Sequence, residues 1–134
     1  MEDGELRPLR GGRHNLSPEV VAFNQRERLL AAVARVTEER GYSEMTVADV
    51  IKLAAVSRRT FYEHFANKEA AFLAAYDAVD DHLHSVLAAA AEGREEWSDR
   101  VVAVIAALID FFAGRPDLAR LYLVEALALG DAFE

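Results

Sequence analysis

The sequence predicts an all-α protein in which a head of three helices is followed by a longer helical body. Apolar residues recur at helical spacing, as Leu29, Val33 and Val36 do in the first such segment. Helix N-caps are expected where three of the later segments begin, and suitable residues stand there: Thr46, Ser57 and Asn67. No segment alternates apolar and polar residues as a half-buried strand does. These three observations favour helices along the whole chain.

Each helix has a start or stop signal that sets its expected bounds. The first runs from about Glu19 to Arg40, and Gly41 ends it. The second begins after Thr46, which forms a variant of the capping box with Asp49 three residues later. The remaining helices are expected at about 57–65, 68–91, 98–112 and 117–129.

Charge divides the 134-residue chain into unlike parts. Residues 1–68 carry 11 Lys and Arg against 10 Asp and Glu, whereas residues 69–134 carry 4 against 13. An acidic body would be repelled by a phosphate backbone, but the first half would not. We therefore expect a flexible arm at 1–18, a nucleic-acid-binding head at 19–68 and a regulatory body at 69–134. The arm is either a solvated tail or a contact to phosphates or the minor groove.

The second and third helices are separated by only Ala55 and Val56. Two helices of about eight residues with so tight a turn must cross steeply, which is the helix-turn-helix arrangement. Phe61 and Phe65 lie one turn apart and should anchor the third helix to the core. This geometry predicts a DNA-binding element whose third helix faces the major groove.

The exposed face of that third helix carries residue types that read DNA. Arg59 can bond bidentately to guanine, and Thr60 can contact a base edge or a thymine methyl group. Tyr62 and His64 can donate to phosphates. Ser57, an N-cap candidate, is predicted beside them as a phosphate contact.

Lys68 is an unusual choice for the first turn of the following helix. A cation there opposes the helix dipole, which favours an anion. The position is explained if a DNA phosphate binds at this N-terminus and contacts both the lysine and the free N–H groups. The alternative is a solvated lysine without a role.

Other classes of function find little support. The chain has no cysteine, and Ser57 and His64 are too far apart, at roughly 10 Å along one helix, to act as nucleophile and base. Of the acidic and histidine residues near His82, only Asp80 and His84 share a helix face, and two ligands do not make a typical metal site. We predict no enzyme activity, cofactor or metal. The longest apolar run has nine residues, which predicts a soluble cytoplasmic protein rather than a membrane protein.

The pattern Ala-x-Val-Ser-Arg-Arg-Thr-Phe-Tyr-x-His-Phe-x-x-Lys-Glu, at residues 54–69, resembles the recognition helix of the TetR/AcrR family of one-component repressors. The resemblance is specific over residues 24–76. It implies that Arg58, Arg59 and Thr60 approach bases. It also implies phosphate contacts from four further residues: Thr46, Tyr62, His64 and Lys68.

The resemblance also implies how such a protein works. A homodimer would bind a palindromic operator in double-stranded DNA and repress transcription, and a small apolar effector would release it. Two departures from the family pattern stand out: Ala55 replaces a common glycine in the turn, and the ligand-binding and dimerisation body is shorter than usual. The alternative is a truncated helical protein-interaction module without DNA binding, which would use the apolar helices at 101–112 and 118–129.

Overall fold

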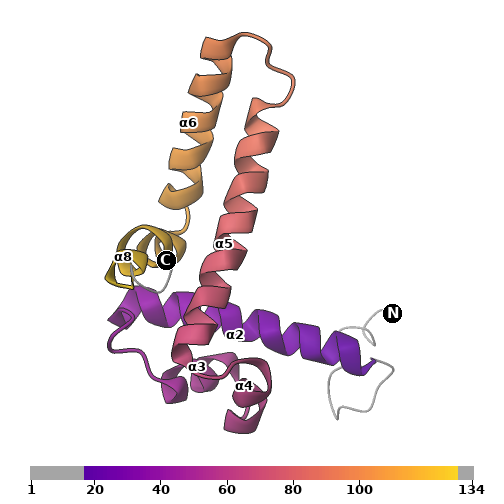
Figure 1. Ribbon diagram of the computed structural model, residues 1–134, viewed down its shortest axis with the longest axis vertical. Helices are drawn as coiled ribbons and strands as arrows, with labels where there is room; N and C mark the ends of the chain where they lie inside the picture. Colours follow the sequence, from indigo (N-terminus) through magenta and orange to yellow (C-terminus); the bar gives the residue numbers. More distant parts are fainter. Residues whose placement is uncertain (1–16, 130–134) are drawn as a thin grey trace, which may run out of the picture.

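The computed structural model describes residues 17–129, and every regular element in that range is helical. Helix α2 (Pro18–Arg40) lies across the base of the molecule, with α3 (Val47–Ala54) and α4 (Arg58–His64) packed beside it (Figure 1). Helix α5 (Lys68–Ala91) rises from this group and extends well beyond it. The all-α prediction is confirmed, and we call α2, α3 and α4 the head.

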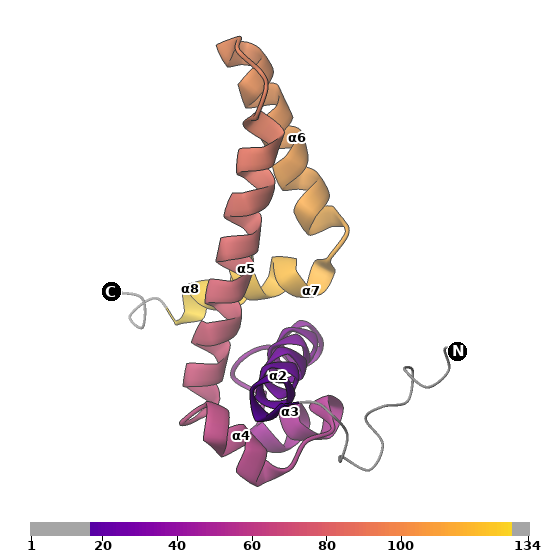
Figure 2. The same cartoon turned by 90° about the vertical axis from the view of Figure 1, so that its right-hand side faces the viewer.

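The rest of the described chain forms the body. Helix α6 (Trp97–Ala113) runs back antiparallel to α5. The chain then crosses above α2, as the turned view shows (Figure 2). This crossing consists of α7 (Pro116–Ala119), a π-helical turn η2 (Arg120–Glu125) and α8 (Ala126–Ala128).

The predicted arm lies outside the described residues except for its last two. Ser17 is the N-cap of α2 and accepts a hydrogen bond from the Val20 N–H at 3.2 Å. Pro18 occupies the first helical position, where its missing N–H costs nothing. The first helix therefore begins one residue before the predicted start.

The hydrophobic core lies where the head meets the base of α5. Its largest fully buried aromatic side chains are Phe61 of α4 and Phe72 of α5. They pack with Leu29 and Val33 of α2 and with Val50 of α3. Leu121 of η2 joins the same cluster, so the body is packed directly onto the head.

Helix α6 is not buried in the core of this chain, although its sequence is apolar on nearly all sides. No α6 residue is buried, and Val102 and Ile109 are 68% and 60% exposed. The reason is that α5 packs along one side of α6 and α7 touches one end, which leaves its outer face uncovered. Within residues 17–129, no helix is both long enough and apolar enough to cross a membrane.

The last predicted helix, 117–129, is interrupted. Pro116 begins a helix as expected, but the backbone changes to π-helical bonding at Arg120 and returns to α-helix at Ala126. Sequence periodicity cannot signal such a turn, because a short π insertion contains no distinctive residue type.

Candidate nucleic-acid interface

The turn between α3 and α4 has the left-handed residue that a tight helix-turn-helix requires. Ala55 has φ 60° and ψ 48° and ends α3, with its N–H bonded to the Ile51 carbonyl. A non-glycine residue in this conformation costs about 1–2 kcal/mol. Ala55 thus adopts, at the position where the family pattern commonly has glycine, the backbone conformation that favours glycine.

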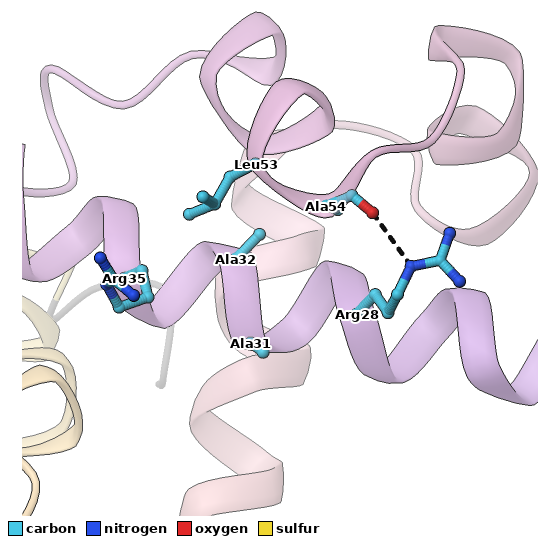
Figure 3. A pocket seen from close by; sticks show the side chains of 6 residues that line it. All are labelled: Arg28, Ala31, Ala32, Arg35, Leu53 and Ala54. Carbon is cyan, nitrogen blue, oxygen red and sulfur yellow. Dashed lines mark hydrogen bonds between the residues drawn. The ribbon is translucent and has the colours of Figure 1, made fainter. Parts of the chain in front are cut away.

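Arg28 of α2 holds this turn from the outside. Its Nε donates to the Ala54 carbonyl at 3.0 Å (Figure 3). Its Nη2 donates to the Ala55 carbonyl at 3.3 Å. These carbonyls belong to the C-terminal end of α3, where a cation is favoured by the helix dipole. The guanidinium therefore stabilises the crossing of α3 and α4. Nothing in the local sequence marked Arg28 for this role.

Beside Arg28 lies a shallow hollow of about 250 Å³ between α2 and α3, with Leu53 and Arg35 among its lining residues (Figure 3). It is open to solvent, and the Arg28 side chain forms part of its wall. This hollow is part of the head surface rather than an enclosed ligand cavity.

Helix α4 is anchored by its aromatic side chains. Phe61 is completely buried and Phe65 is 5% exposed, as the one-turn spacing predicted. Their rings lie 5.8 Å apart, and the Arg26 guanidinium sits 5.1 Å above the Phe65 ring. Because this side of α4 is fixed in the core, the opposite side is held outward.

The outward side of α4 presents the predicted base readers. Arg58 and Arg59 are exposed, and the Arg59 side chain retains 88% of its accessible surface. Arg59 pairs with Glu63 one turn later at 3.3 Å. An ion pair this exposed contributes little, so Glu63 can be exchanged for another acceptor at small cost.

Ser57 and Thr60 form a small hydrogen-bonded unit at the start of α4. The Ser57 hydroxyl accepts from the Thr60 N–H at 3.0 Å, which confirms Ser57 as the N-cap. The same hydroxyl donates to Thr60 Oγ1 at 3.0 Å. The Ser57 hydroxyl therefore donates its proton to Thr60, and the Thr60 hydroxyl proton points away from Ser57. The phosphate contact predicted for Ser57 gains no support from this arrangement.

Thr46 begins α3 with the predicted capping box. Its hydroxyl accepts from the Asp49 N–H, and the Asp49 carboxylate accepts from the Thr46 N–H, both at 3.1 Å. Hydrogen bonding with the Thr46 side chain lowers the pKa of the Asp49 carboxyl, and the nearby Arg40 guanidinium lowers it further. Thr46 remains exposed at the end of the helix, where a phosphate can reach it.

The two aromatic phosphate candidates differ in exposure. Tyr62 is 50% exposed and meets the Phe61 ring edge-on, so its hydroxyl is held on the surface. His64 is half-buried, with Nε2 3.5 Å from Gln25 Oε1 of α2. Tyr62 is thus presented more openly than His64.

Lys68 makes contacts within the protein that the sequence did not predict. Its ammonium donates to the carbonyls of Tyr42, Ser43 and Met45 at 3.0, 3.3 and 2.8 Å, and it lies 4.5 Å above the Tyr42 ring. An ammonium has three protons, and all three are used within the protein. Lys68 therefore holds the loop between α2 and α3, and a phosphate contact from it would have to share these protons.

Comparison with known proteins agrees with this geometry. Residues 29–75 match the family of bacterial regulatory proteins described as the tetR family. The head of this chain is therefore similar to that of bacterial regulatory proteins of the tetR family. The matched segment contains the later part of α2, the whole helix-turn-helix and the first part of α5.

Named relatives share the head and part of the body. The chain is 31% identical over 109 residues to the HTH-type transcriptional activator FasR of Mycolicibacterium smegmatis, which covers 81% of this chain and 48% of FasR. It is 35% identical over 75 residues to the HTH-type transcriptional regulator TtgR of Pseudomonas putida, covering 56% of this chain and 35% of TtgR. It is 29% identical over 106 residues to the nucleoid occlusion factor SlmA of Vibrio cholerae, covering 78% of this chain and 54% of SlmA. The chain spans about a third to a half of these relatives' length.

Solved structures share the fold at lower identity. The fatty acid degradation regulator FadR of Bacillus halodurans superposes with a TM-score of 0.74 at 18% identity, covering 87% of this chain and 58% of that one. A TetR family transcription regulator from Marinobacter aquaeolei gives 0.73 at 22% identity, covering 78% and 55%. The helical fold of this chain is therefore shared with these solved structures.

Proposed function

We propose that this protein is a transcriptional regulator that binds double-stranded DNA in a sequence-specific manner through α4. Arg58, Arg59 and Thr60 read bases in the major groove, and Thr46, Tyr62 and His64 contact phosphates. Lys68 contributes indirectly by holding the loop that leads to Thr46. We infer that it acts in the cytoplasm, where bacterial DNA is found.

The observation that carries this proposal is the two-sided character of α4. One side is fixed in the core by Phe61 and Phe65, while Arg58 and Arg59 project from the other with no buried partner among residues 17–129. A short, rigidly anchored helix with exposed arginines near its N-terminal end suits readout of base edges. The family match supports the same reading.

The finer mechanism is a further part of the proposal. Two chains bind a palindromic operator with their α4 helices about 34 Å apart, one turn of DNA, and so repress transcription. A small apolar effector releases them by favouring a different spacing of the heads. A solvent-open hollow of about 190 Å³ between α2, α5 and α7 would give such a molecule contact with both head and body; its lining includes apolar Leu30 and Leu118 but also charged Arg115.

Selection from random duplex DNA, followed by sequencing, tests the proposal first. An enriched inverted repeat supports a sequence-specific dimer, and a single enriched half-site supports a head that binds alone. Absence of any enrichment at low salt contradicts DNA binding by this chain.

Arg59→Ala then tests base readout. We expect operator binding to weaken by about 1–3 kcal/mol and discrimination at the contacted base pair to relax, because a bidentate contact to guanine is lost. Affinity measured for the operator and for variants at each position checks this.

Arg35→Ala is the matched control, because Arg35 forms the same type of exposed ion pair one helical turn from its partner, with Glu39 on α2. It should leave sequence discrimination unchanged. Equal effects of the two substitutions would remove Arg59 from the base readers and leave only a general charge effect.

A second candidate function is a protein-interaction module without DNA binding. The exposed apolar side chains of α6, including Val102, Ile105 and Ile109, favour it. A tight homo- or hetero-complex formed by a chain that enriches no DNA would place this function first.

A further inference from the structure

The π-helical turn η2 makes polar contacts with the loop between α2 and α3. Glu125 Oε1 accepts a hydrogen bond from the Tyr42 N–H at 2.9 Å, and Glu125 Oε2 accepts from Arg120 Nε at 3.0 Å. Arg120 Nη1 donates to the Glu38 carbonyl at 2.8 Å, near the C-terminal end of α2. Tyr42 and Glu125 are 83 positions apart in sequence, and Glu38 and Arg120 are 82 apart, so these two contacts join the body to the head.

The π-helical backbone explains why Arg120 and Glu125 can act together. In an α-helix of 3.6 residues per turn, two residues five apart point in directions that differ by about 140°. In π-helical bonding the hydrogen bond runs from residue i+5 to residue i, which places these two residues one above the other. The change of backbone at Arg120–Glu125 therefore brings the guanidinium and the carboxylate onto one face.

The same loop is shaped to accept these side chains. Gly41 has φ 84°, and a Cβ atom at this position would lie 2.9 Å from Arg120 Nη2. The guanidinium thus packs against bare backbone where a side chain would intrude. The loop is also held by Lys68 of α5, whose ammonium donates to three of the loop's carbonyls.

Burial makes this ion pair more consequential than the exposed pairs of the head. The Glu125 side chain retains only 13% of its accessible surface and that of Arg120 retains 40%. Removing Arg120 leaves the mostly buried Glu125 carboxylate without its counter-ion, which is more costly than losing a surface pair.

We propose that Arg120 and Glu125 are positioning residues for DNA binding, which hold the 41–46 loop and thereby place Thr46 and the start of α3. This inference rests on the proposed function, because it assigns to two body residues a part in operator binding without any contact to DNA. Loss of either side chain loosens the loop, and α3 with its neighbour α4 is then held less firmly against α2 and α5.

Arg120→Ala and Glu125→Ala test the proposal in the full chain, with two measurements on each variant. The first is hydrogen–deuterium exchange of residues 41–46. The second is the affinity of each variant for the DNA sequence that the unmodified protein selects. We expect faster exchange of the loop and about tenfold weaker DNA binding, the factor that follows from losing one hydrogen bond to a charged group. Glu125→Gln keeps an acceptor for the Tyr42 N–H but loses the ion pair with Arg120, so both properties should fall between those of the unmodified protein and of Glu125→Ala.

Arg100→Ala is the matched control. Arg100 Nη1 also donates to backbone carbonyls, those of Ala91 and Arg94, but it does so where α5 turns into α6, at the end far from the head (Figure 1). It should leave the exchange of residues 41–46 and the DNA affinity unchanged.

The outcomes separate this inference from the proposed function. Faster loop exchange together with weaker DNA binding, in the Arg120 and Glu125 variants but not in Arg100→Ala, supports the positioning role. Unchanged loop exchange overturns it, and so does faster exchange with unchanged DNA affinity. If the unmodified protein selects no DNA, the proposed function fails and the assignment to DNA binding falls with it, while the exchange data still decide whether Arg120 and Glu125 hold the loop.

Discussion

The head and helix α6 both carry apolar side chains, but they place those side chains differently. In the head, α2, α3 and α4 each bury apolar side chains against two or more neighbours, and Phe61 is fully enclosed. Helix α6 carries a continuous apolar run from Val101 to Ile109 but buries none of it. It has α5 along one side and α7 at one end.

The comparison teaches that an apolar sequence predicts a buried helix only when enough partners surround it. A helix that is apolar on most sides needs neighbours on most sides, since one antiparallel neighbour covers a single stripe.

The head and α6 also differ in how their helices begin. Thr46, Ser57 and Asn67 cap their helices through side chains, whereas Glu96 at the start of α6 makes no side-chain cap.

The largest expected effect comes from deleting a core side chain of the head. Phe61→Ala should destabilise the protein by about 3–5 kcal/mol, because it removes a fully buried ring and leaves a cavity. Ile109→Ala on the exposed face of α6 should change stability by no more than about 0.5 kcal/mol. Urea unfolding of both variants measures the difference. A large cost for Ile109→Ala would show that α6 is covered in solution and would remove the contrast.

The helix caps give a smaller effect. Thr46→Ala should cost about 1 kcal/mol, because the Asp49 N–H loses its acceptor and the capping box is broken. Glu96→Ala, at the equivalent position of α6, removes no cap hydrogen bond and should be close to neutral. Thermal unfolding compares the two. Equal losses would mean that Glu96 also caps its helix in solution.

The smallest expected effect is a gain at the turn of the helix-turn-helix. Alanine in a left-handed conformation costs about 1–2 kcal/mol, and glycine adds about 0.4–1 kcal/mol of entropy to the unfolded chain. Ala55→Gly should therefore stabilise the protein by about 0.5–1 kcal/mol. Ala48→Gly, on the exposed side of α3, should instead destabilise it by about 1 kcal/mol. Loss of stability in Ala55→Gly would contradict a left-handed Ala55.

Much of the head could be predicted from local patterns. Thr46, Ser57 and Asn67 were expected N-caps, and each accepts the hydrogen bond from a backbone N–H three residues later. The one-turn spacing of Phe61 and Phe65 predicted their burial and, with it, the exposure of Arg59. Caps and one-turn pairs depend on residues within four positions of one another, so the sequence alone contains them.

Lys68 shows the limit of prediction from local patterns. Its place in the first turn of α5 was noticed, but its partners are three carbonyls 23 to 26 positions earlier. Arg28, which holds the Ala54 and Ala55 carbonyls, carried no local signal at all. Both side chains bind backbone groups, and any residue type can offer a carbonyl, so no pattern of residue types reveals such partners.

Local sequence patterns are sufficient to predict the all-helical fold, the helix-turn-helix of the head and the side of α4 that faces outward, because each depends on spacing within one or two helical turns. The tertiary structure alone decided that Lys68 serves the loop, that α6 leaves its apolar face uncovered and that Arg120 and Glu125 meet the head through a π-helical turn. These features arise from contacts between segments far apart in the chain, whose relative positions are set only when all the helices have packed.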